Sequence, residues 1–278
     1  MSVTITAKQV NELRQMTGAG MMDCKKALVE SEGDIEKAIE ILRKKGQKVA
    51  SKRADRDAKE GKIVAKVTPD GKFGAMIMLN CETDFVANTP DFIRISNAIA
   101  DLAVENRVKT MDELLKLKMG DRTVEEAIVE NTGKTGEKNT LAHLCTIEGE
   151  LVSAYNHLGN RVATLVALNK SGEKMTQAGH EIAMQIAAMA PVSVDAKSVP
   201  QEVIDRELEI ARDQIRQEGK PENMVENIAK GKLQKFFKEN TLYNQEFVRD
   251  SKMTVLQYIK SIDANMEVLG FYRLILGE

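Results

Sequence analysis

The chain has 278 residues, of which 42% are hydrophobic and 29% are charged. This composition is ordinary for a soluble protein and supplies enough apolar material for a sizeable core, in one large domain or about two to three small ones. The formal net charge is −2, so the whole molecule has no field that attracts polyanions, which argues against a strongly basic nucleic-acid-binding protein.

Cysteine usage and hydropathy indicate a cytoplasmic protein. Cys24, Cys81 and Cys145 lie far apart, their number is odd, and no Cys-x-x-Cys occurs, as expected for reduced thiols. The sequence has no secretory signal and no apolar run near the roughly 20 residues that span a bilayer. We therefore expect no membrane partner.

Residues 1–54 are predicted to form a small three-helix domain followed by the start of a basic linker. Apolar residues such as Val10 and Leu13 recur at helical spacing, as in a small independent bundle. The predicted boundaries are a capping box of Thr6 and Gln9 before the first helix, residues 21–28 for the second, and Asp34 and Gly46 at the two ends of the third.

Residues 43–62 form a strongly basic segment interrupted by Asp55, Asp57 and Glu60. One interpretation is a patch that binds RNA or phosphate. A solvated linker or helix face is favoured, because no aromatic side chain is interleaved for base stacking and the acids interrupt the basic run.

The rest of the chain contains an internal repeat. A shift of 88 residues brings Gly61 onto Gly149 and the apolar run 75–78 onto 163–166. Each copy has the pattern of a hairpin with a glycine-containing turn, followed by an amphipathic helix. The sequence therefore predicts two related subdomains, each with a small antiparallel sheet and helices.

The turn between strand and helix in the first copy carries the most informative residues. Asp84 and Phe85 follow an apolar run and precede Pro90, at a kind of turn that often carries function. The ring could enter a partner's groove while the carboxylate displaces an anion. The alternative, favoured by spacing alone, is that Asp84 solvates the turn and Phe85 folds back into the core. The second copy has neither residue at the matching positions 169–172.

A helical hairpin and a final strand complete the predicted organisation. Ile204, Leu208, Ala211 and Ile215 have coiled-coil spacing, and residues 219–221 turn the chain into a returning helix. We expect this hairpin to project into solvent with a self-packed apolar seam. The predicted fold class is α+β, with domains at residues 1–54, 55–140 (first core subdomain), 141–200 (second core subdomain), 201–240 (inserted coiled-coil hairpin) and 241–278 (rest of the second subdomain).

The sequence lacks the common signatures of an active site. It has no P-loop and no Gly-x-Ser-x-Gly, and His143, His157 and His180 are not spaced as metal ligands. Cys81 follows a strand and is better explained as a structural thiol than as a nucleophile. His157 falls in the hairpin turn of the second copy, where we expect exposure. These features favour an interaction protein over an enzyme, with no cofactor, no metal and no direct nucleotide binding.

Two segments resemble the paired signatures of the bacterial elongation factor Ts family. Residues 13–28 (LRQMTGAGMMDCKKAL) are similar to the first signature and residues 79–88 (LNCETDFVAN) to the second, at nearly every position and in order. Further similarity at residues 155–157, 219–236 and 270–273 extends the resemblance over essentially the whole chain. It implies a ubiquitin-associated-like (UBA-like) fold for the three-helix domain.

The resemblance implies a guanine-nucleotide exchange factor that binds elongation factor Tu, the GTPase that carries aminoacyl-tRNA, and speeds release of its GDP. Asp84 and Phe85 would press near the magnesium ion of the GTPase. Thr83 and Val86 would hold that turn. The other residues expected to contact the partner are Leu13, Met21 and Met22 for its G domain, and His157 for its third domain.

Other interpretations stay open. The second is a non-catalytic adaptor that binds through residues 1–54, which also resemble a nascent-chain-binding domain, and the third is an enzyme that uses Cys81. A homodimer is also open. Some members of the family carry a further helix after the last strand, and the sequence ends at Glu278 without one, so contacts of that helix are not transferred.

Overall fold

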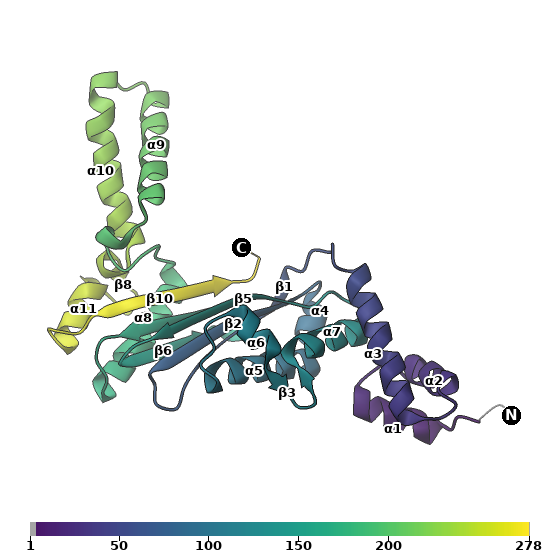
Figure 1. Cartoon of the computed structure of the whole chain (residues 1–278). Helices are drawn as coiled ribbons and strands as arrows, with labels where there is room; N and C mark the ends of the chain where they lie inside the picture. Colours follow the sequence, from purple (N-terminus) through teal and green to yellow (C-terminus); the bar gives the residue numbers. More distant parts are fainter. Residues whose placement is uncertain (1–3, 278) are drawn as a thin grey trace.

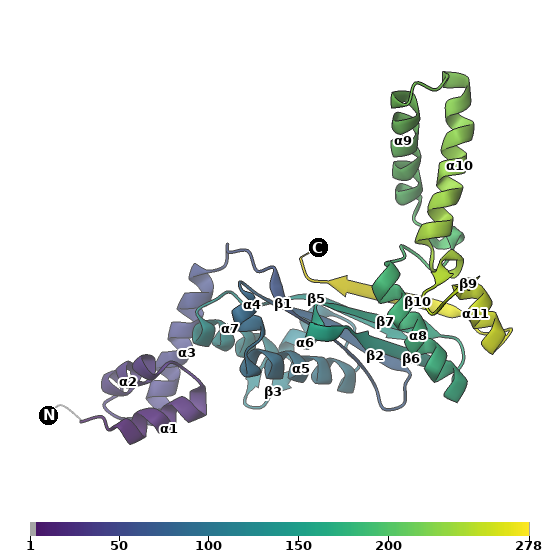
Figure 2. The ribbon, with the colours of Figure 1, turned by 180° about the vertical axis from the view of Figure 1, so that it is seen from behind.

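The computed structural model describes residues 4–277 and shows a small helical domain, a two-sheet core and a projecting helical hairpin (Figure 1). The small domain and the hairpin lie at opposite ends of the core, as the view from behind also shows (Figure 2). The predicted α+β class is confirmed. Residues 1–3 of the predicted first domain, and Glu278, lie outside the described part. None of the helices within residues 4–277 is long and apolar enough to cross a membrane.

The small domain contains α1 (Ala7–Thr17), α2 (Met21–Glu30) and α3 (Ile35–Lys52). The predicted capping box begins α1, and the Asp34 carboxylate accepts a hydrogen bond from the Lys37 amide at 3.0 Å at the start of α3. The inward faces of the three helices form one buried cluster of Val10, Leu13, Cys24, Ala27, Leu28 and Ala38. The helical spacing of apolar residues therefore predicted the burial of Val10 and Leu13 correctly, whereas Met16, which continues that spacing, is exposed.

The predicted end of the third helix at Gly46 is wrong. α3 continues to Lys52, and Gly46 is buried where the helix crosses α7 (Val124–Thr135). Two glycines make this crossing close, because a Cβ atom on Gly133 would lie 2.6 Å from the Cα atom of Gly46. α3 is therefore a continuous arm that joins the small domain to the core. Much of the basic segment 43–62 is consequently helix surface.

The core contains two three-stranded antiparallel sheets, with the orders β1 (Glu60–Val67), β2 (Phe73–Cys81), β5 (Thr140–Glu148) and β10 (Val268–Ile275), β7 (Val162–Leu168), β6 (Leu151–Asn156). The hairpins β1–β2 and β6–β7 are followed by the long helices α5 (Pro90–Glu105) and α8 (Glu173–Met189), as the internal repeat predicts. The predicted final strand is β10. β5 pairs with β2, so the first sheet takes a strand that extends across the boundary expected at residue 140.

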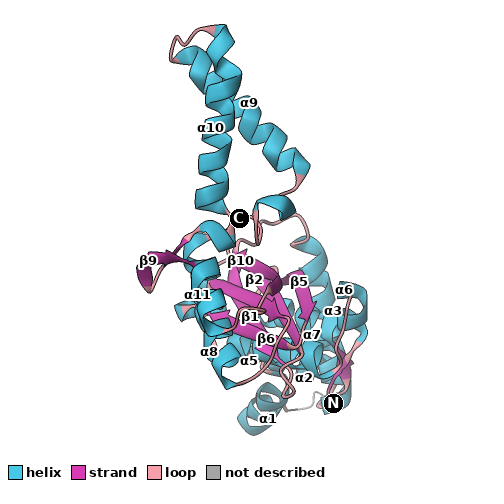
Figure 3. Ribbon diagram, turned by 90° about the vertical axis from the view of Figure 1, so that its left-hand side faces the viewer, coloured by secondary structure: helices cyan, strands magenta, loops and turns pink. Residues whose placement is uncertain are grey.

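The two sheets pack face to face, and helices cover their outer faces (Figure 3). Alternate side chains of β2 point to opposite layers, since Phe73 and Ile77 pack with α5 whereas Met76 and Met78 pack against the second sheet. β2 is therefore buried along nearly its whole length. This burial fixes the position at which the chain leaves β2 after Cys81.

The predicted hairpin is formed by α9 (Gln201–Gln217) and α10 (Glu222–Asn240), and it projects from the core (Figure 1). Its predicted seam is self-packed, with Ala211 and Ile215 buried against Val225 and Ala229. The other α-helices and strands are α4 (Asp84–Ala87), α6 (Met111–Lys116), β3 (Lys118–Met119), β4 (Arg122–Thr123), β8 (Glu246–Phe247), β9 (Asp250–Thr254) and α11 (Val255–Ile262).

Candidate protein-docking site

α4 is a single helical turn that carries an exposed aromatic ring directly after β2. The Thr83 hydroxyl caps this turn by accepting a hydrogen bond from the Val86 amide at 3.4 Å. Val86 and Ala87 face the core, so the opposite side of the turn presents Asp84 and Phe85 to solvent. Phe85 is 83% exposed, and the alternative in which its ring folds back into the core is therefore wrong.

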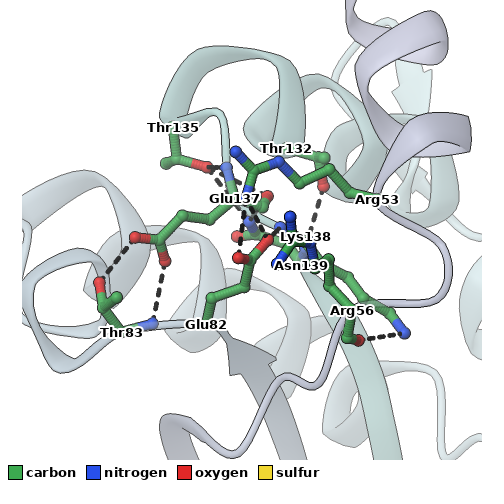
Figure 4. Close-up of polar contacts among 9 residues, drawn as sticks. All are labelled: Arg53, Arg56, Glu82, Thr83, Thr132, Thr135, Glu137, Lys138 and Asn139. Carbon is green, nitrogen blue, oxygen red and sulfur yellow. Dashed lines mark hydrogen bonds and ion pairs between the residues drawn. The ribbon is translucent and has the colours of Figure 1, made fainter.

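A glutamate from a distant part of the chain holds the base of residues 83–86, which we call the docking turn (Figure 4). Glu137 lies in the loop between α7 and β5. Its carboxylate accepts a hydrogen bond from the Thr83 hydroxyl at 2.7 Å and another from the Thr83 amide at 3.0 Å. Both polar groups at the start of the docking turn are thereby fixed to the α7–β5 loop.

The neighbouring Glu82 ties the same region to the α3 arm (Figure 4). Its carboxylate accepts the Lys138 amide at 2.7 Å and forms an ion pair with Arg53, which directly follows α3, at 2.7 Å. The hydrogen bond from the Lys138 amide, assisted by Arg53, lowers the pKa of Glu82 below its ordinary value. The Lys138 ammonium also donates to the Ala54 carbonyl at 2.7 Å. Arm, loop and docking turn therefore meet in one polar network.

The docking turn lies beside the hairpin turn of the second sheet. The Lys62 ammonium, on β1, donates to the Asn88 side chain and to the Gly159 carbonyl, at 2.9 Å each. Lys62 is almost fully buried, and its ammonium links Gly159 of the hairpin turn to Asn88, which directly follows α4. We call the surface formed by the two turns the docking edge.

The second turn presents an imidazole and an apolar side chain. His157 is exposed, as predicted, and its Nδ1 atom lies 2.9 Å from the Tyr155 hydroxyl, which orients the ring. Leu158 is 92% exposed, more than any other large apolar side chain in the described residues. The docking edge therefore combines two exposed apolar side chains with an oriented histidine.

Side-chain amides hold the second turn against the free edge of β1. Asn156 accepts the Ala65 amide at 2.8 Å and donates to the Ala65 carbonyl at 2.9 Å, as a neighbouring strand would. Asn160 donates to the Ile63 carbonyl at 2.9 Å. These bonds satisfy backbone groups that the sheet leaves unpaired and fix the turn relative to β1.

The small domain exposes methionines, but one predicted contact residue is misplaced. Met21 and Met22, at the start of α2, are exposed, and so is Met16 near the end of α1. Leu13 is fully buried, so the expectation that it contacts a partner is wrong. Leu13 lies three positions after Val10, on the face of α1 that packs against the other two helices. The first signature therefore contains both core and surface residues.

Cys81 lies at the end of β2 under the docking turn. Its thiol is buried and donates a hydrogen bond to the Thr83 carbonyl at 3.1 Å. Burial raises the pKa of the thiol to about 12, so the reactive thiolate is scarce at neutral pH. These features favour a structural thiol over the nucleophile of the third interpretation.

We expect Cys81 to resist alkylation by iodoacetamide in the folded chain near neutral pH, because the thiolate is the reactive form. The raised pKa means that the folded chain holds the thiol proton more tightly than the unfolded chain does. The corresponding contribution to the free energy of unfolding is complete below the ordinary pKa of 9.0 and is lost as pH rises toward about 12. Mass spectrometry of the Cys81 peptide measures the labelling, with the guanidinium-unfolded chain as the control. Equally fast labelling of the folded and the unfolded chain would contradict the assignment of Cys81 as a buried structural thiol.

The resemblance named Thr83, but sequence reasoning missed Glu137, Glu82 and Arg53 as supports of the docking turn. Thr83 and Glu137 are separated by 54 positions, and no local pattern joins them. Arg53 belongs to a charged run in which no pattern assigns a partner, and its partner Glu82 lies 29 positions away. Leu158 did have a signal, because an apolar residue beside Gly159 in a predicted hairpin turn has no core to face.

A two-sheet core that presents exposed apolar side chains beside polar ones is typical of a protein that docks onto another macromolecule. The family model described as Elongation factor TS matches residues 82–278. Proteins named Elongation factor Ts from Christiangramia forsetii and Amoebophilus asiaticus are 50% and 51% identical to the chain, over 98% and 99% of its length and 99% and 100% of theirs. The chain belongs to the elongation factor Ts family. Its role is that of a translation elongation factor, a nucleotide exchange factor for elongation factor Tu.

Proposed function

We propose that the docking turn releases GDP from elongation factor Tu by disturbing the magnesium and phosphate site of the partner. The observation that carries this proposal is the exposed ring of Phe85 on a turn that Thr83 caps. Asp84 places a carboxylate beside the ring, where it would repel phosphate oxygens or compete for the metal.

Loss of the metal explains the release in physical terms. Magnesium neutralises the diphosphate, so its displacement leaves unpaired anionic charge and weakens GDP binding. The factor stabilises the nucleotide-free state of the partner, and by linkage a returning nucleotide weakens the binding of the factor equally. GTP then loads and the complex dissociates. No covalent bond forms or breaks in this scheme, so the acceleration comes from differential binding to the empty state.

Further contacts would supply the affinity for the partner. We assign His157 to the third domain of elongation factor Tu, and Met21 and Met22 to its G domain. Leu158 adds exposed apolar surface next to His157. Binding energy from these contacts can be used to distort the nucleotide site, which the docking turn reaches.

Release of a fluorescent GDP analogue from elongation factor Tu, with and without the chain, tests the role directly. In excess unlabelled GDP, we expect release to accelerate with the concentration of the chain until it saturates. No acceleration at any concentration would overturn the proposal.

Removal of magnesium is expected to shrink the effect of the chain. With excess EDTA the partner lacks the ion that neutralises the diphosphate, so unassisted release speeds up and less remains for the docking turn to disturb. If the metal accounts for about 1.4 kcal/mol of the barrier or more, the ratio of assisted to unassisted release falls at least about ten-fold. Stopped-flow fluorescence in both buffers measures this ratio. An unchanged ratio would mean that the turn acts on something other than the magnesium site.

A further inference from the structure

We propose that Glu137 is a positioning residue for the docking turn, which acts by fixing Thr83 and thereby the direction in which Phe85 points. This inference rests on the proposed function of Phe85 and extends it to a residue outside both signature segments. Glu137 contacts neither Asp84 nor Phe85 through any hydrogen bond found in residues 4–277, so its effect passes through Thr83.

The docking turn needs support from outside, because α4 has only four residues. A helix this short is not stable by itself, since one turn fixes several dihedral angles for very few hydrogen bonds. Its own capping bond, from the Val86 amide to the Thr83 hydroxyl, is long at 3.4 Å. The two bonds from Thr83 to Glu137 are shorter, at 2.7 and 3.0 Å, and involve a carboxylate, which makes them the stronger contacts.

The carboxylate of Glu137 is well placed for this task, because the loop that carries it is itself ordered by hydrogen bonds (Figure 4). The Glu137 amide donates to the Thr135 hydroxyl at 3.3 Å, and the Asn139 side chain donates to the Glu137 carbonyl at 2.7 Å. The backbone amide of Asn139 in turn donates to the Thr132 hydroxyl of α7 at 3.1 Å. Each Glu137 oxygen then accepts one bond from Thr83, so the pair acts as a two-point clamp.

The two glutamates at the base of the turn have different tasks. Glu82 pairs with Arg53 and the Lys138 amide, which links the loop to the α3 arm. Glu137 binds the residue that immediately precedes Asp84. A change at Glu137 therefore alters the direction of the turn while the ion pair that ties the arm to the core stays in place.

The test uses GDP release from elongation factor Tu at saturating and subsaturating concentrations of the full-length chain. Glu137→Ala frees Thr83, and because the other contacts still bind the partner, we expect the maximal release rate to fall about ten-fold with a smaller change in the half-saturating concentration. Glu137→Gln is expected to restore most of the rate. Its Oε1 atom can accept the Thr83 amide, and its Nε2 atom can donate to the Thr83 hydroxyl oxygen.

Glu113 provides a matched control, because its carboxylate also accepts a backbone amide at the start of a short helix. Glu113 accepts the Thr110 amide at 3.1 Å in the capping box of α6, away from the docking edge. Glu113→Ala is expected to leave the maximal release rate unchanged. Circular dichroism shows whether each variant folds, and Glu137→Asp, which keeps the charge but shortens the reach, replaces Glu137→Ala if the latter is unfolded.

A double variant, in which Glu137→Ala is added to Phe85→Ala, distinguishes a positioning role of Glu137 from a general loss of structure. In Phe85→Ala, the ring that Glu137 positions is gone and only Asp84 still depends on the direction of the turn, so adding Glu137→Ala is expected to slow release less than it does in the wild type. Equal slowing in both backgrounds, or a wild-type rate for Glu137→Ala and Glu137→Asp, would overturn the role of Glu137 while leaving the proposed function intact. A wild-type rate for Phe85→Ala alone would instead overturn the proposed function.

Discussion

Phe85→Ala is expected to slow GDP release from elongation factor Tu about thirty-fold at a fixed concentration of the chain, if the ring supplies the roughly 2 kcal/mol of a typical interface anchor. The stability of the chain should hardly change, because the ring is 83% exposed and contributes little to the core. Fluorescent GDP release measures the rate, and thermal unfolding measures the stability.

Val248→Ala provides the control for the loss of an exposed apolar side chain. Val248 is about half exposed and lies between β8 and β9, outside the proposed contacts. We expect this variant to match the wild-type rate. A Phe85→Ala variant that also matches it, while remaining folded, would remove the main support for the docking turn as the active element.

Gly133→Ala is expected to lower the stability of the folded chain substantially. The new Cβ atom would lie 2.6 Å from the Cα atom of Gly46, a distance that backbone atoms do not tolerate. α3 must then move away from α7, which costs about 1–3 kcal/mol as in other overpacked sites. The movement also displaces the small domain with Met21 and Met22, so affinity for the partner should fall as well.

Gly46→Ala is the matched control at the same crossing. Its Cβ atom would lie 3.6 Å from Gly133, which is ordinary van der Waals contact. Alanine is also favoured over glycine in a helix by about 1 kcal/mol. We therefore expect chemical denaturation to give a lower free energy of unfolding for Gly133→Ala and an unchanged or higher one for Gly46→Ala. A free energy of unfolding for Gly133→Ala that is not lower than that of the wild type would mean that the two helices are farther apart at this crossing.

The predictable part of this fold is the part that local periodicity determines. The capping box, the three-helix core, the two hairpins of the repeat and the coiled-coil seam follow from spacings of a few residues. The end of α3 does not, because Gly46 has the local character of a helix end and is kept inside the helix by packing against Gly133. That contact joins residues far apart in the sequence.

The candidate site was predictable in its position but not in its orientation. The strand, the turn and the helix around Asp84 follow from pattern, whereas the outward direction of Phe85 depends on Val86 and Ala87 packing inward. Leu13 shows the opposite error, because a signature match does not separate core from surface. Glu137 had no signal, since only the folded chain brings it to Thr83.

The amide side chains along β1 have a consequence for the behaviour of the protein at high concentration. An open strand edge is a template for intermolecular pairing and aggregation. Asn156 and Asn160 occupy the backbone groups of Ala65 and Ile63 that such a pairing would use. The turn that carries His157 therefore also covers a template for aggregation, and we expect substitution of these asparagines to lower the solubility of the chain as well as to loosen the turn.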